Sequence, residues 1–244
     1  MKTWIFFIAP ALAICSDQTP VQRLFDAKLT ASERATACFE LRGNSDPDVV
    51  SAMGKALEDP AVLSCAADNL RIAGAMDVLQ QALSNQEAQV RAAAVRQLGT
   101  FQKPELLAVI FQAAQDVNLL VSTNALAGLN EYQDPVVVPY LADLAKRGGM
   151  IGDMALDRLE QLESATALAV ARGLLASSQV PDRLYAMRVI GAFGDASDLR
   201  TLNPIAKSAP ENLSQRNRGF GFMPAINLAR AAQSAIASIQ SRSK

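Results

Sequence analysis

Alanine and a larger aliphatic residue four positions later recur along the chain at a nearly constant interval. The seven couples are Ala37–Leu41, Ala66–Leu70, Ala94–Leu98, Ala125–Leu129, Ala155–Leu159, Ala186–Ile190 and Ala232–Ile236. Successive couples are separated by 29, 28, 31, 30, 31 and 46 residues. Because positions i and i+4 share one face of an α-helix, the pattern predicts seven helices. In each, the leucine or isoleucine fills the space between neighbouring helices and the alanine lets the next helix approach.

A second set of amphipathic segments alternates with these helices. They span about 46–58, 75–84, 103–116, 134–147, 163–177 and 196–208, and residues 20–28 supply a first one. Asp-Pro pairs at 46–47, 59–60 and 134–135 offer an N-cap oxygen and a preset φ for the first turn. One helix pair cannot cover its own apolar face, so neighbouring pairs must stack. The sequence therefore predicts an all-α fold, a solenoid of about seven helix pairs.

The repeat resembles the HEAT-like family, in the short form named after bilin lyases. The resemblance rests on stretches such as Val90–Gly99 followed by Lys103–Leu107, and it covers about residues 20–208 and 225–240. It implies a right-handed α-α superhelix in a single domain, residues 16–244, with an insertion at about 208–224. Family members include bilin lyases, an iron hydroxylase, DNA-base repair enzymes and pure scaffolds, so the resemblance leaves function open.

Composition excludes several kinds of site. The chain contains no histidine, which removes His-ligated zinc, Ser-His-Asp and Cys-His nucleophile systems, and the His-Glu metal motifs of the hydroxylase. The formal net charge is −1 and the pI is near 5.6, which argues against a nucleic-acid partner because phosphate contacts need a surplus of Lys and Arg. We therefore expect a protein without catalytic residues, metal or cofactor.

The first fifteen residues have the pattern of an export signal. Lys2 precedes an uncharged apolar run from Thr3 to Ile14, which is too short to span a bilayer. Ala11-Leu12-Ala13 fits a small-x-small cleavage site, whereas Leu12-Ala13-Ile14-Cys15 resembles a bacterial lipobox with Cys15 as the lipidated residue. Ile14 departs from the lipobox, which wants Gly, Ala or Ser before the cysteine. We expect an exported protein, periplasmic or anchored in a bacterial envelope through a lipid on Cys15, and retain a cytoplasmic chain with an apolar N-terminal helix as the alternative.

Cys38 and Cys65 form an even pair once Cys15 is set aside. Cys38 follows its repeat alanine by one residue and Cys65 precedes the next repeat alanine by one. On adjacent parallel helices these offsets point the two side chains toward each other from opposite flanks. Two interpretations stay open: a disulfide, which needs Cα atoms within about 7 Å, or two small buried thiols.

Residues two or three positions after each repeat alanine should project from one exposed face. They are Phe39, Glu40, Asp68, Asn69, Arg96, Gln97, Asp157, Arg158 and Arg188. In HEAT-like arrays this row usually lines the concave groove. Its mixed charge predicts a protein or peptide partner rather than a phosphate track, with a plain solvated face as the alternative.

The insertion at about 208–224 offers a second candidate surface. Phe220 and Phe222 are flanked by Arg216 and Arg218, a combination suited to a partner-contact tip. The alternative is a loop that folds back to cover the last apolar face of the solenoid. The favoured interpretation is a non-enzymatic interaction module or scaffold of the bacterial envelope. The alternative is a lyase or repair enzyme on the same scaffold, which a deep pocket with converging polar groups would favour.

Overall fold

The structure is a computed structural model that describes residues 18–133, 135–162, 165–208 and 227–242. The chain forms two compact units, Met1–Ala75 (unit 1) and Met76–Lys244 (unit 2). The described residues of both units form helices and no β-strand. None of these helices is long and apolar enough to cross a membrane. The expected signal peptide (1–15) and most of the expected insertion (208–224) lie outside the described residues.

Unit 1 contains two helix pairs. Its helices are α1 (Pro20–Leu24), α2 (Ala31–Glu40), α3 (Pro47–Ala56) and α4 (Leu63–Ile72). Thr19 and Thr30 close capping boxes at the starts of α1 and α2, and Asp46 caps α3 ahead of Pro47. Helix α1 packs on α2, α3 packs on α4, and α2 contacts α4. The expected cap at Asp46-Pro47 is confirmed.

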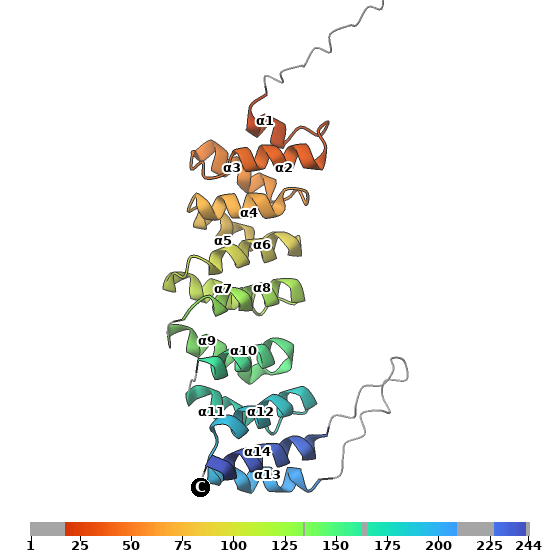
Figure 1. Cartoon of the computed structure of the whole chain (residues 1–244). Coiled ribbons are helices and arrows are strands. Elements are labelled where there is room, and N and C mark those ends of the chain that lie inside the picture. Colours follow the sequence, from red (N-terminus) through yellow and green to blue (C-terminus); the bar gives the residue numbers. More distant parts are fainter. Residues whose placement is uncertain (1–17, 134, 163–164, 209–226, 243–244) are drawn as a thin grey trace, which may run out of the picture. The chain divides into compact units, whose positions relative to one another are not determined.

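The described residues of unit 2 form five further pairs, which Figure 1 draws one after another. Its α-helices are α5 (Met76–Ala82), α6 (Ala88–Gly99), α7 (Leu107–Ala113), α8 (Leu119–Asn130), α9 (Val138–Arg147), α10 (Gly149–Gln161), α11 (Ala165–Leu174), α12 (Val180–Phe193), α13 (Leu199–Ala206) and α14 (Leu228–Arg242). Short 3-10 turns η1 (Pro104–Leu106), η2 (Pro135–Val137) and η3 (Ala196–Asp198) precede α7, α9 and α13. Each odd-numbered helix packs on the even-numbered helix that follows it.

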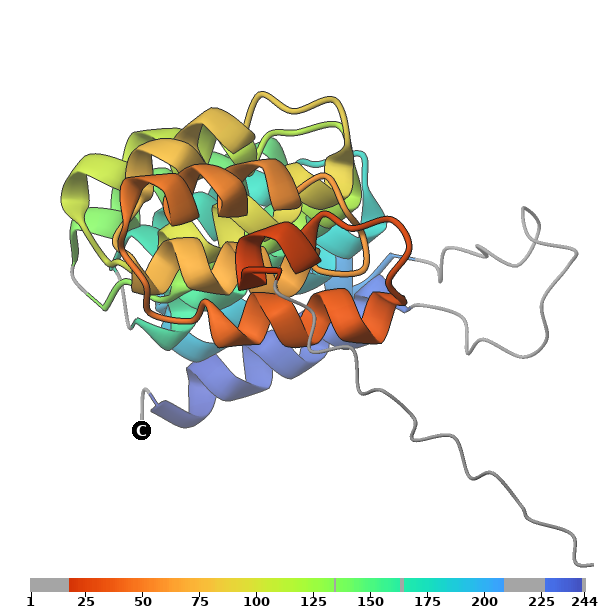
Figure 2. The same cartoon turned by 90° about the horizontal axis from the view of Figure 1, so that it is seen from above.

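The even-numbered helices of unit 2 also pack on one another. Contacts join α6 to α8, α8 to α10, α10 to α12 and α12 to α14, while α9 contacts α11 on the other side. The helices of this unit thus fall into two layers, an A layer of odd-numbered helices and a B layer of even-numbered ones (Figure 2). With two pairs in unit 1 and five in unit 2, the described residues confirm the expected all-α solenoid of about seven helix pairs.

The alanine–leucine couples form the core of the B helices. All seven alanines are 0% exposed, and the first six aliphatic partners are at most 6% exposed. Ile236 is the exception, because it is only half-buried, and α14 buries Ala235 and Ile239 in its place. Those two residues are also spaced i, i+4, so the last B helix keeps the rule but is turned so that a neighbouring face meets α12 and α13.

Helices α6 and α8 approach so closely that their backbones touch. Gly99, the last residue of α6, lies against Gly128 of α8, and a Cβ built on Gly99 would sit 2.3 Å from the Cα of Gly128. Only a residue without a side chain fits there. The small-residue rule of the B row therefore extends beyond the alanines to this glycine pair.

One detail of the predicted turns needs revision. Asp59-Pro60 does not open a helix, because α4 begins only at Leu63, with Val62 as its N-cap. The Asp59 carboxylate instead accepts a hydrogen bond from the backbone N–H of Ala61, which closes a turn ahead of the helix. The third Asp-Pro pair begins at Asp134, which lies outside the described residues.

Candidate partner-binding surface

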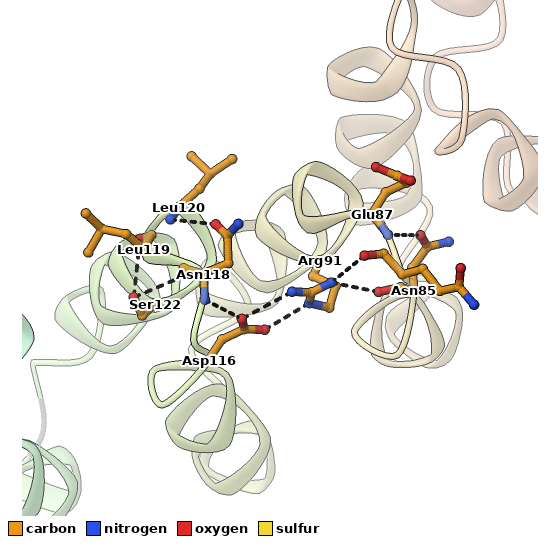
Figure 3. A network of polar contacts seen from close by, with 9 residues as sticks. Asn85, Glu87, Arg91, Asp116, Asn118, Leu119, Leu120 and Ser122 are labelled. Atoms are coloured by element: carbon orange, nitrogen blue, oxygen red, sulfur yellow. Dashed lines mark hydrogen bonds and ion pairs between the residues drawn. The ribbon is translucent and has the colours of Figure 1, made fainter.

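A half-buried arginine–aspartate network fixes the turn between α7 and α8 (Figure 3). Both nitrogens of the Arg91 fork donate to Asp116, at 2.9 and 3.1 Å, and its third nitrogen donates to the carbonyls of Asn85 and Gln86. The Asp116 carboxylate also accepts the backbone N–H of Asn118. The hydrogen bonds from Arg91 hold the pKa of Asp116 below its usual range. The network locks two successive A-to-B turns of unit 2 together.

The same spacing occurs in unit 1. Arg34 donates to Asp59 at 3.0 Å, and 25 residues separate this pair just as they separate Arg91 from Asp116. Both arginines precede their repeat alanine by three residues. The sequence analysis missed these pairs, although an Arg three residues before the repeat alanine, followed by an Asp 25 residues later, was a signal that could have found them.

The charged residues predicted on the B helices of unit 2 mostly tie one B helix to the next. Arg96 of α6 lies 3.2 Å from Glu131 at the end of α8. Arg188 of α12 lies 2.5 Å from Asp157 and 2.8 Å from Glu160, both on α10.

Arg158 of α10 reaches back toward the end of α8 in the same way. Its guanidinium donates to the carbonyl of Asn130 at 3.1 Å. The predicted face therefore exists, but its charges are largely neutralised by neighbouring repeats, so they offer a partner fewer free hydrogen-bonding groups than the sequence suggested.

The predicted site residues of unit 1 differ in their exposure and in their ion pairs. Phe39 is 58% exposed, whereas Glu40 forms an ion pair with Arg23. Asp68 accepts from Arg42 at 2.9 Å and from Arg71 at 2.6 Å.

The expectation of exposure is wrong for Asn69. It is 4% exposed, and its side-chain N–H donates to the Cys38 carbonyl at 2.9 Å. The side-chain amide of Asn69 can be buried because it is hydrogen-bonded to the backbone of the neighbouring helix α2.

Cys38 and Cys65 are joined by a disulfide in the structure. It links α2 to α4, with Cα atoms 6.3 Å apart and a sequence separation of 27. The sulfur of Cys38 is fully buried, and that of Cys65 lies in a half-buried side chain. Of the two interpretations left open by the sequence, the structure has the disulfide.

A pocket of about 420 Å³ opens on the exposed face of α10 and α12, next to the Asp157–Arg188 ion pair. Met150 and Met154 of α10 are 52% and 41% exposed at its rim, and Tyr185 of α12 forms part of its wall. The guanidinium of Arg188 lies 5.0 Å from the centroid of the Tyr185 ring, a cation–π contact. The pocket thus continues the predicted face toward the N-terminal ends of the two B helices.

Two buried carboxyl groups line this pocket. Asp153 of α10 is 5% exposed and Asp182 of α12 is 3% exposed. Asp182 accepts the backbone N–H of Gly149 at 2.9 Å and the Ser177 hydroxyl at 2.6 Å. Burial, the nearby charge of Asp182 and a hydrogen bond between the two carboxyl groups raise the pKa of Asp153 to about 6.

An unusually short turn explains this carboxyl pair. The three other A-to-B turns that the structure describes in unit 2 close on a side-chain oxygen that accepts the N–H two residues later, from Asn85, Asp116 and Ser177. The turn between α9 and α10 is reduced to Gly148-Gly149, with φ of +67° and +68°, and has no such side chain. Asp182 from the following pair supplies the acceptor, and a Cβ on Gly148 would lie 2.3 Å from its Oδ2.

The sequence analysis missed Asp153 and Asp182. The available signal was Asp182, which stands four residues before its repeat alanine where five of the other six repeats have Val, Ile or Leu, together with the Gly148-Gly149 pair. The remaining predicted site residues, Cys15, Arg216, Arg218, Phe220 and Phe222, lie outside the described residues. No group of three or more His, Cys, Asp or Glu among the described residues could hold a metal ion.

Comparisons with known proteins agree with the repeat architecture. The HEAT repeats family profile matches residues 76–149, which hold α5 to α9. Comparison with functionally characterised proteins finds no significant match.

Solved structures of repeat proteins are similar over most of the chain. Human deoxyhypusine hydroxylase in complex with glycerol is 18% identical, with a TM-score of 0.38, covering 91% of this chain and 95% of that one. A designed armadillo repeat protein is 16% identical, with a TM-score of 0.34, covering 91% and 100%. It is the family profile that shows residues 76–149 to be similar to HEAT repeats, the family that the sequence resemblance indicates.

Proposed function

We propose that this protein is a non-enzymatic interaction module that binds a protein or peptide partner through the exposed face of its B helices. In unit 2 this face is the surface of α10 and α12 around Met150, Met154 and Tyr185. The observation that carries the proposal is an open pocket rimmed by two exposed methionines beside an aromatic ring. Methionine is flexible and polarisable, and it is over-represented on surfaces that accept partners.

The composition of the surface supports a protein partner over nucleic acid. Arg188, a basic side chain of this face, already contacts Asp157 and Glu160, so it is not free to bind phosphate. Two carboxyl groups line the pocket itself, which disfavours a phosphate further. The 208–224 segment, with Phe220 and Phe222, remains the second candidate surface.

We also infer export to a bacterial envelope, with Cys15 as a lipid anchor. The Cys38–Cys65 disulfide supports this, because disulfides persist in oxidising compartments and are rare in the cytosol. The apolar run ahead of Cys15 supports it independently. Intact-mass analysis of membrane and soluble fractions tests the inference. A lipidated chain beginning at Cys15 is expected, and a soluble product that retains Met1 would contradict it.

Affinity capture from envelope fractions tests the binding surface. The double variant Met150→Glu/Met154→Glu places two charges on the rim, so it should lose the partner that the wild-type chain retains. A chain that lacks residues 209–223 serves as the parallel variant. If Met150→Glu/Met154→Glu retains the partner and the chain lacking residues 209–223 loses it, the partner binds at the 208–224 segment instead of the α10–α12 surface.

A further inference from the structure

The floor of the α10–α12 pocket carries negative charge without a matching cation. Elsewhere in unit 2, Asp116 has Arg91, and Asp198 has Arg172 at 2.8 and 2.9 Å. Asp153 and Asp182 have each other, and no Lys or Arg of the described residues lies within ion-pair distance of either. Two close carboxyl groups repel when both are ionised, so a cation between them would relieve an unfavourable arrangement.

One oxygen of this pair has no hydrogen-bond partner. The Oδ1 atom of Asp153 is buried and unpaired, although Asp153 forms part of the pocket wall. A buried acceptor without a donor costs about 1–3 kcal/mol, and more when the group is charged. A donor that enters the pocket would satisfy it. Asp153 Oδ1 thus lacks a hydrogen-bond donor, and the carboxyl pair to which it belongs lacks a neighbouring positive charge.

The geometry favours an ammonium group over a guanidinium group. Both oxygens of Asp182 are already occupied, by Gly149 and Ser177, and Asp153 has one free oxygen because the other side of its carboxyl group faces Asp182. A guanidinium needs two parallel acceptors for its fork, whereas an ammonium is a compact point charge that can use one.

The walls of the pocket suit the alkyl chain that would carry the ammonium. Met150 and Met154 offer apolar, adaptable surface, and Tyr185 offers an aromatic face. The pocket volume of about 420 Å³ falls within the range of small ligand sites.

We propose that the α10–α12 pocket binds the primary ammonium of an alkyl amine, presented by a lysine side chain of the partner, with Asp153 as its hydrogen-bond acceptor and Asp182 as a second negative charge beside it. The assignment of the amine to a protein rests on the interaction function proposed above. The lysine stem lies between the methionines of α10 and Tyr185 of α12. The ammonium group donates to Asp153 Oδ1.

Methionine-methyl NMR of the full chain tests this proposal. The probe is the peptide acetyl-Gly-Gly-Lys-Gly-Gly-amide, and the readout is the methyl shifts of Met150 and Met154. We expect saturable shifts of both. Asp153→Asn, which keeps the shape of the side chain, should weaken binding at least about tenfold. Asp143→Asn is the matched control, because Asp143 is an exposed carboxylate of α9 that pairs only with Arg147 at 2.9 Å, and it should bind as wild type.

Three matched ligands distinguish the chemistry. The peptides with Nε-acetyllysine or arginine in place of lysine should bind at least about tenfold more weakly. Equal binding of the acetylated peptide, or unchanged binding by Asp153→Asn, would overturn the proposal. The third ligand, 1,5-diaminopentane, separates the two sources of an alkyl ammonium. Binding of the diamine without binding of the lysine peptide would assign the site to a free amine and overturn the peptide source.

The capture experiment separates this proposal from the function on which it depends. Loss of the captured partner in Met150→Glu/Met154→Glu, together with no response to the lysine peptide, would leave the interaction surface standing and remove the lysine site. Wild-type chain that captures no partner would overturn the interaction function, whatever the peptide does.

Discussion

The contact between Gly99 and Gly128 gives the sharpest test of how the B helices stack. A methyl group on Gly99 would meet the Cα of Gly128 at 2.3 Å and its carbonyl carbon and oxygen at 2.9 Å. These are backbone atoms of α8, so no side-chain rotation can make room. Helices α6 and α8 would have to separate along a packed interface.

The magnitude follows from two opposing effects. Overpacking a close contact costs about 1–3 kcal/mol, and the upper end applies because backbone must move. Alanine favours a helix over glycine by about 0.5–1 kcal/mol, which offsets part of this. Gly99→Ala should therefore destabilise the protein by about 2 kcal/mol and lower its Tm by about 4–8 °C.

Gly128→Ala is the matched control within the same contact. A Cβ there would lie 3.3 Å from the Cα of Gly99 and 3.4 Å from Cγ2 of Ile110, so the neighbours need to shift by only a few tenths of an ångström. The helix-propensity gain should balance this small strain, leaving the free energy of unfolding within about 0.5 kcal/mol of wild type.

Urea unfolding followed by circular dichroism measures both variants. The midpoint should fall for Gly99→Ala with an unchanged slope, because the surface exposed on unfolding stays the same. Wild-type stability of Gly99→Ala, or equal destabilisation by the two substitutions, would refute the close approach of α6 and α8.

Three further predictions concern charges and the disulfide. The pKa of Asp153 is raised from 3.8 to about 6 in the folded state, so its ionised form destabilises the fold above pH 6. Asp153→Asn should therefore raise the free energy of unfolding above pH 6 by up to about 3 kcal/mol. The gain should vanish near pH 4 when unfolding is measured as a function of pH. Arg91→Met should lower the free energy of unfolding by about 2 kcal/mol at pH 7, because it leaves the half-buried Asp116 carboxylate unpaired. The pair lowers the pKa of Asp116, so this loss of stability should shrink as the pH falls below about 4. A loss of stability that does not depend on pH would contradict the ion pair. Reduction of the Cys38–Cys65 disulfide, which closes a loop of 27 residues, should destabilise unit 1 by about 3–4 kcal/mol, and a Cys38→Ala/Cys65→Ala variant should show no further change with reductant.

The sequence could predict the architecture because each repeat places a small residue and a large aliphatic residue at fixed positions of its B helix. In a helix that packs against neighbours on both sides, an alanine and a leucine at i and i+4 face the interior. This predicts correctly which face is buried in six of the seven couples. Ile236 departs from the rule because a couple shifted by three residues, Ala235–Ile239, fits the interface of α14 equally well. Such a shift depends on tertiary packing, which periodicity does not encode.

The candidate site was predictable only in part. The exposed B-helix face that holds Asp157 and Arg188 follows from helical geometry, but the pairing of these two residues depends on how far α10 lies from α12. The Asp153–Asp182 pair depends on a turn so short that a residue 33 positions away supplies its acceptor to Gly149. Sequence patterns describe each helix by itself, whereas this pocket arises from the contact of two.

Site-specific photocrosslinking tests the central claim that the B-helix face holds a protein partner. A benzoylphenylalanine at position 154, on the exposed rim of the α10–α12 pocket, and one at position 112, on the exposed side of α7 in the A layer, would be compared in cells of the native host. A discrete adduct with a partner protein is expected from position 154 and none from position 112. Adducts from position 112 alone, or from neither position, would contradict the claim.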